Sequence, residues 1–111
     1  MPRRQILILL AAAGLLPGPL AAAEFSGQAA FEHTRQAVAF GPRPPGSPAL
    51  ARLRAYIVSK VKALGAGITE DAFTAQTPIG PIRMVNVIAR FPGTSGKAVA
   101  VTGHYDTKLL P

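Results

Sequence analysis

Apolar residues recur at helical spacing between residues 26 and 40. Ser26 is a suitable N-cap residue, good helix formers follow it, and Gly41 comes directly after the pattern. The apolar members of the pattern are Ala30, Phe31, Ala37 and Val38. The sequence therefore predicts a first helix over residues 26–40.

A second helical pattern follows the stretch "GPRPPGSP" (residues 41–48), whose prolines and glycines are typical of an extended connector. Ser47 can cap this helix with Pro48 at its first position, and Gly65 suits the left-handed conformation that often ends a helix. Between them, apolar residues form one stripe along the helix. The stripe consists of Leu50, Leu53, Ile57, Val61 and Leu64.

After this helix the spacing becomes typical of strands. Residues 68–76 ("ITEDAFTAQ") and 82–91 ("IRMVNVIARF") flank "TPIGP", which favours a hairpin connection. The turn "PGTSGK" then leads into residues 98–103 ("AVAVTG"). Both faces of this last segment are apolar, with Val99 and Val101 on one and Ala98 and Ala100 on the other. This pattern is typical of a strand covered on both faces.

The order of helix, helix, hairpin and buried strand predicts an α/β fold. We expect the amino-terminal portion of a mixed-sheet α/β/α sandwich. A strand that is apolar on both faces needs neighbours beside it and helices above and below, because an exposed apolar edge promotes aggregation. Two helices and one hairpin do not supply that cover. We therefore expect residues 24–111 to be a truncated part of a larger domain.

The first 23 residues have the pattern of an export signal. Two arginines precede "QILILLAAAGLLPGPLAAA", and Pro17 and Pro19 interrupt this apolar stretch before it could span a bilayer. Ala21 and Ala23 fit a cleavage site, so we expect a mature chain from residue 24 that is periplasmic or extracellular and is not inserted in a membrane. An uncleaved anchor is the alternative. The paired arginines are compatible with twin-arginine or general export.

Charge and cysteine content indicate which partners and which kind of stabilisation to expect. Beyond residue 23 the chain carries ten basic and five acidic side chains. The basic residues are scattered and no aromatic residues interleave with them, so we expect no nucleic-acid partner. The chain has no cysteine, and an exported protein of this kind must be stabilised by apolar burial rather than by disulfides.

A histidine and an aspartate follow the predicted strand at residues 98–103. In open α/β sheets, functional groups gather beyond the carboxyl ends of strands, where His104 and Asp106 are placed. In extended backbone, side chains two positions apart point to the same side, so Asp106 can orient the imidazole or share its ligand. A carboxylate on the second ring nitrogen is typical of metal-binding histidines. The alternative is a loop histidine beside a turn-forming aspartate.

The other acidic and histidine residues do not complete a metal site. A zinc ion takes three or four protein ligands. Glu32 and His33 are neighbours on different faces of the first helix, and we expect His33 to be an exposed helix residue. Glu70 and Asp71 point to opposite faces of a strand. Glu24 lies at the flexible start of the expected mature chain.

Three stretches cover nearly all of the chain from about residue 40 onward: "PRPPGSPALARLRAYIVSKVKALGA", "DAFTAQTPIGPIRMVNVIARFPG" and "AVAVTGHYDTK". Together they resemble the amino-terminal part of metallopeptidase family twenty-eight, the zinc aminopeptidase group that includes the glutaminyl-peptide cyclotransferases. The R-x-P-G-S segment and the H-Y-D triplet occur across that group. "QTPIG" after "DAF", and a lysine directly after H-Y-D-T, are more similar to the cyclotransferase branch.

The resemblance implies the zinc exopeptidase fold and a site at His104. In the aminopeptidase branch, the matching histidine binds one zinc of a bridged pair and the aspartate at Asp106 is its partner. In the single-zinc cyclotransferase branch, the matching histidine lies near the site without binding the metal. His104 is therefore a candidate metal ligand and Asp106 a candidate catalytic residue. The family's other zinc ligands and its acid/base glutamate come later than this motif.

The sequence is compatible with three functions. The resemblance implies a zinc enzyme acting at the amino termini of peptides or proteins, either a glutaminyl cyclotransferase that releases pyroglutamate and ammonia or an aminopeptidase that uses water. The third is a small exported module without catalysis. Because one histidine and one carboxylate fall short of a zinc site, we expect this chain by itself to bind zinc weakly and to be inactive.

Overall fold

A computed structural model describes residues 24–108. In chain order its elements are α1 (Gly27–Ala39), α2 (Pro48–Ala63), β1 (Gly67–Thr77) and β2 (Gly80–Arg90). The predicted order of two helices and an antiparallel hairpin is confirmed. The export signal predicted for residues 1–23 lies outside the described residues. Within residues 24–108, neither helix is long and apolar enough to cross a membrane.

Both helices begin at the caps expected from the sequence. The Ser26 hydroxyl accepts a hydrogen bond from the Ala29 N–H, and the Ser47 hydroxyl accepts one from the Leu50 N–H, each at 3.1 Å. These bonds satisfy backbone donors that have no partner inside the helix. After α2, Gly65 adopts a φ of +88°, the left-handed conformation that lets the chain leave the helix for β1.

The hairpin has one continuous antiparallel register. It runs from Gly67 opposite Arg90 to Thr77 opposite Gly80, so two residues connect the strands. The Thr77 hydroxyl closes this connection, because it donates to the Gly80 carbonyl at 2.6 Å and accepts from the Ile79 N–H at 3.3 Å. The turn chemistry thereby fixes which side chains of β1 and β2 are neighbours.

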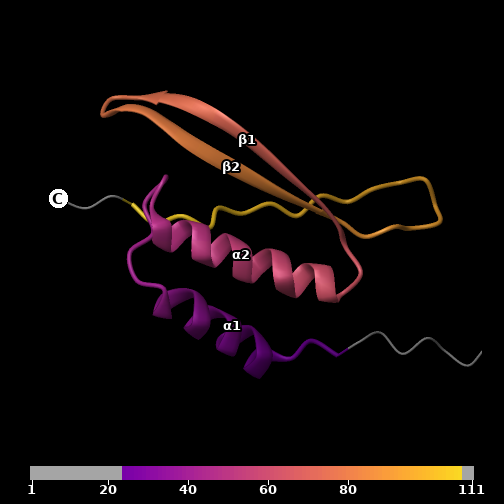
Figure 1. Ribbon diagram of the computed structural model, residues 1–111. Helices are drawn as coiled ribbons and strands as arrows, with labels where there is room; N and C mark the ends of the chain where they lie inside the picture. Colours follow the sequence, from indigo (N-terminus) through magenta and orange to yellow (C-terminus); the bar gives the residue numbers. More distant parts are fainter. Residues whose placement is uncertain (1–23, 109–111) are drawn as a thin grey trace, which may run out of the picture.

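The core lies where α2 meets the hairpin, and α1 lies on the other side of α2 (Figure 1). Among the described residues, the buried apolar side chains are Leu50, Leu53 and Ala66. The predicted α2 stripe is therefore correct at its beginning and wrong at Leu64, which is 74% exposed. Tyr56 of α2 contacts the end of α1, where its ring centroid lies 6.1 Å from that of Phe40.

The buried strand predicted for residues 98–103 is wrong for this structure. The segment has no regular secondary structure, and Val99 and Val101 are 93% and 95% exposed. A strand needs a neighbour for its backbone groups, and among the described residues the sheet consists of β1 and β2 alone. The segment instead returns along β2 in the opposite direction without pairing (Figure 1). The complete α/β/α sandwich stays a prediction.

Candidate functional site

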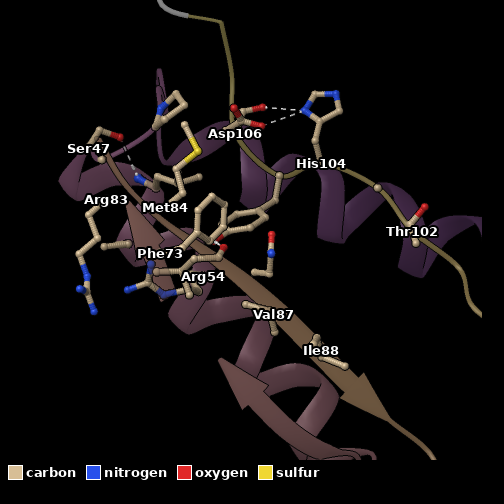
Figure 2. Close-up of a pocket in the computed structure, with 18 of the residues that line it drawn as sticks. Ser47, Arg54, Phe73, Arg83, Met84, Val87, Ile88, Thr102, His104 and Asp106 are labelled. Carbon is tan, nitrogen blue, oxygen red and sulfur yellow. Dashed lines mark hydrogen bonds and ion pairs between the residues drawn. The ribbon is translucent and has the colours of Figure 1, made fainter. Parts of the chain in front are cut away.

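A groove of about 830 Å³ lies between α2, β2 and the returning segment 101–106 (Figure 2). Leu50 and Ala51 of α2 line it together with Val85 and Val87 of β2. His104 belongs to the segment that closes the other side. The groove therefore combines apolar side chains with polar ones, among them Arg54, Arg83 and the imidazole of the predicted site.

His104 and Asp106 lie next to one another, as their spacing predicted. The imidazole Nδ1 of His104 is 3.2 Å from Oδ1 of Asp106 and 3.1 Å from the Asp106 carbonyl oxygen (Figure 2). Both of these atoms are acceptors, so in the neutral ring the proton belongs on Nδ1. Nε2 then keeps its lone pair, and the His104 side chain is 87% exposed. This is the tautomer in which Nε2 can bind a metal ion or accept a proton.

The residues that alternate with this pair fasten the segment to the rest of the protein. The Tyr105 hydroxyl donates to the Val85 carbonyl of β2 at 2.6 Å. The Thr107 N–H donates to the Arg43 carbonyl at 2.9 Å, and the Thr107 hydroxyl accepts from the Arg43 N–H at 2.7 Å. Positions 105 and 107 thus anchor the chain, while positions 104 and 106 carry the candidate site.

Arg43 links this segment to the end of α1. Its Nη1 donates to the carbonyls of Ala37 at 2.8 Å and Gly41 at 2.7 Å, near the end of α1. The stretch "GPRPPGSP" is therefore a support for the H-Y-D segment as well as a connector. The sequence interpretation missed Arg43, Tyr105 and Thr107. The available signal was the alternation of Tyr105 and Thr107 with the candidate pair in extended chain.

The other acidic residues have partners elsewhere. Glu32 accepts hydrogen bonds from Arg35 at 2.9 and 2.7 Å and from Gln36 at 3.1 Å, and these lower the pKa of its carboxyl from 4.5 to about 2. Glu70 forms an ion pair with Arg54 at 3.2 Å. These carboxylates are engaged on α1 and between β1 and α2, away from His104.

The remaining candidates also have hydrogen-bond partners of their own. Asp71 accepts a hydrogen bond of 3.4 Å from the side-chain amide of Asn86 across the hairpin. His33 is exposed, as expected, and its Nδ1 lies 2.7 Å from the hydroxyl of Tyr56 on α2. Across residues 24–108, no three histidine, aspartate or glutamate side chains gather in a position to hold a metal ion. The described residues therefore do not form a zinc site by themselves.

Comparisons with known proteins identify relatives of one kind. The chain is 38% identical over 71 residues to a glutaminyl-peptide cyclotransferase-like protein of Bos taurus and 35% identical over 71 residues to one of Mus musculus. Each alignment covers 62% of this chain, and the chain spans 18% of the length of each relative. No family model matches the chain.

A solved structure agrees with these relatives. The glutaminyl cyclase of an Acidobacteriales bacterium superimposes with a TM-score of 0.61 and 41% sequence identity, over 75% of this chain and 29% of that protein. The chain thus has homologues among glutaminyl-peptide cyclotransferase-like proteins, and its two helices and hairpin are consistent with part of a glutaminyl cyclase fold. Membership of metallopeptidase family twenty-eight stays a prediction from the sequence.

Proposed function

We propose that residues 24–108 form the amino-terminal part of a glutaminyl cyclotransferase that acts on the amino termini of peptides or proteins. The observation that carries the proposal is the 41% identity to a solved glutaminyl cyclase at a TM-score of 0.61. The names of the relatives favour the cyclotransferase over the aminopeptidase. Since the chain spans 18% of those relatives, the activity is proposed for a protein of their length.

The proposed reaction closes an amino-terminal glutamine on itself. The α-amine attacks the side-chain carbonyl carbon, a carbon–nitrogen bond forms, and the amide nitrogen leaves as ammonia with the proton that the amine gives up. Asp106 would hold the Nδ1 proton of His104, so that Nε2 presents a lone pair beside the groove. A groove that combines apolar side chains with polar ones such as Arg54, Arg83 and Asn86 suits the binding of a small substrate segment.

We further propose zinc as the metal of the complete enzyme. The resemblance to the cyclotransferases implies that His104 lies near this metal without binding it, with Asp106 as its partner; His104 would be a ligand in the aminopeptidase alternative. These two side chains fall short of the three protein ligands of a catalytic zinc ion, so residues 24–108 account for no step that depends on the metal. Export through the signal at residues 1–23 is part of the same proposal, as is the absence of a nucleic-acid partner or stable membrane insertion.

A chimeric enzyme tests the cyclotransferase proposal directly. Residues 40–108 would replace the matching part of the Acidobacteriales bacterium glutaminyl cyclase, and release of ammonia from a glutamine-initiated peptide would be measured. We expect the chimera to cyclise this peptide and to leave leucine amide intact. Hydrolysis of leucine amide without cyclisation would instead support an aminopeptidase. A folded chimera that consumes neither substrate would contradict the proposal.

The candidate pair is tested in the same chimera. His104→Ala and Asp106→Asn should both lower turnover, because the first removes the imidazole and the second weakens the acceptor for its Nδ1 proton. Asp71→Asn is the matched control, since Asp71 lies on β1 and bonds to Asn86. Equal turnover in all three variants would show that the pair has no part in catalysis.

A further inference from the structure

We propose that Tyr105 is a positioning residue for His104. The hydrogen bond from its hydroxyl to the Val85 carbonyl holds the H-Y-D segment against β2 and thereby fixes where the imidazole stands at the groove. The importance of this position for turnover rests on the proposed function. The positioning itself is a property of residues 24–108.

His104 cannot fix its own position in the protein. Both hydrogen-bond partners of its imidazole among the described residues belong to Asp106, two positions away on the same segment. The side chain is 87% exposed, so packing does not restrain it. The bonds of the imidazole therefore depend on the backbone conformation of residues 104–106, and that conformation depends on what holds the backbone in place.

The carbonyl of Val85 faces the edge of β2 that is not paired with β1. Successive residues of a strand direct their backbone groups to opposite edges. Pro81 has no N–H to give to β1, and a proline in a strand is tolerated where that group would face away from the partner strand. Val85 is four positions further along β2 and shares this orientation. Tyr105 thus fills an acceptor that the hairpin leaves unpaired.

Thr107 and Tyr105 hold different parts of the segment. Arg43 and Thr107 hold the end of the segment that follows Asp106. Tyr105 lies between His104 and Asp106 and contributes the hydrogen bond to the sheet. Without its hydroxyl, the segment would stay attached at Thr107, but the backbone next to His104 would lose its bond to β2.

The chain provides a matched experiment, because it contains two tyrosines and two histidines. Tyr105 is adjacent to His104 in the sequence, whereas the Tyr56 hydroxyl bonds to His33. Tyr105→Phe and Tyr56→Phe would be prepared in the full 111-residue chain. The nitrogen shifts of both imidazoles would be recorded by NMR, since these shifts distinguish the Nδ1–H tautomer from the averaged state.

In the wild-type chain we expect His104 to show the Nδ1–H tautomer and the Tyr105 ring to lie in contact with Val85. In Tyr105→Phe, the two nitrogens of His104 should shift toward averaged values while His33 keeps its own. In Tyr56→Phe, His33 should change and His104 should not. This reciprocal pattern is one that a general loss of stability would not produce.

Three outcomes would overturn the proposal. One is a wild-type spectrum that lacks the contact between Tyr105 and Val85, as the spectrum of an unfolded chain would. Another is an unchanged His104 in Tyr105→Phe. The third is global unfolding of Tyr105→Phe, because Tyr105 would then stabilise the whole fold rather than position one side chain.

A kinetic measurement separates this proposal from the proposed function. In the cyclase chimera, Tyr105→Phe should lower kcat by roughly tenfold, as is common for groups that orient a catalytic histidine, with little change in KM. Tyr56→Phe should leave both constants unchanged. If the chimera is inactive while the NMR pattern is as expected, the proposed function fails and the positioning role of Tyr105 stands. A raised KM at constant kcat would contradict the positioning role.

Discussion

Arg43 and Thr107 are 64 positions apart in the sequence, yet two hydrogen bonds of 2.7 and 2.9 Å join them. One uses the Thr107 hydroxyl and the other uses backbone groups of both residues. The contact brings the proline-rich connector and the H-Y-D segment together at the end of α1. The position of the candidate site thus depends on Arg43, which has no part in the proposed reaction.

Replacement of Thr107 by valine should destabilise the chain. Valine keeps the shape of threonine but leaves the Arg43 N–H without its acceptor, which costs about 1 kcal/mol. Thr107→Ser retains the hydroxyl and should lose less. The free energy of unfolding in urea would be compared for the three proteins. Equal losses for valine and serine would show that the methyl group, rather than the hydrogen bond, stabilises this contact.

Gly46 should tolerate substitution less well than Gly41. Both residues have a positive φ, +81° and +78°, so alanine strains the backbone by about 1 kcal/mol or more at either position. A Cβ at Gly46 would also lie 3.3 Å from the Cγ2 of Ile82, whereas nothing lies within 4 Å at Gly41. Urea midpoints of the two alanine variants provide the comparison. A larger loss at Gly41 would contradict the close approach of the connector to β2.

Glu32 should titrate far below an ordinary glutamate. Hydrogen bonds from Arg35 and then Gln36 lower its pKa from 4.5 to about 2. A lowered pKa means that this contribution to stability is complete above pH 4.5 and is lost as the pH falls through about 2. A carboxyl-carbon NMR titration measures the pKa. Arg35→Met should return it toward 4.5, and Arg52→Met on α2 is the control that should not.

Zinc should bind weakly to the 111-residue chain. The pair at His104 and Asp106 offers one imidazole and one carboxylate, and among the described residues no third ligand lies with them. Titration calorimetry should therefore show no submicromolar site. A tight site that disappears in His104→Ala but persists in His33→Ala would refute this expectation and would mean that further ligands gather around His104.

Local signals predicted most of the fold. Ser26 and Ser47 cap their helices as expected, and the hairpin turns within the predicted "TPIGP" stretch, with a connection of two residues where five were expected. Each of these features depends on a few neighbouring residues, so the printed sequence contains the whole signal. The exposure of Leu64 shows the limit, because burial depends on what packs against the helix rather than on its own periodicity.

The segment from residue 98 shows what the sequence could not provide. Its two-sided apolar pattern predicts a strand, but a strand forms by pairing with a distant part of the chain. The same difference between local patterns and distant contacts applies to the candidate site. The closeness of His104 and Asp106 follows from their spacing. The alternation of Tyr105 and Thr107 with this pair is visible in the sequence, whereas their partners, 20 and 64 positions away, are not.

The exposed valines at 99 and 101 have a practical consequence for handling the protein. A short run of β-branched and small apolar residues without charge is the kind of sequence that stacks with copies of itself into fibrils, and here its side chains are open to solvent. Lys97 is the nearest charge before it and can slow such stacking. Purified protein should therefore aggregate least when it is stored dilute and at low salt.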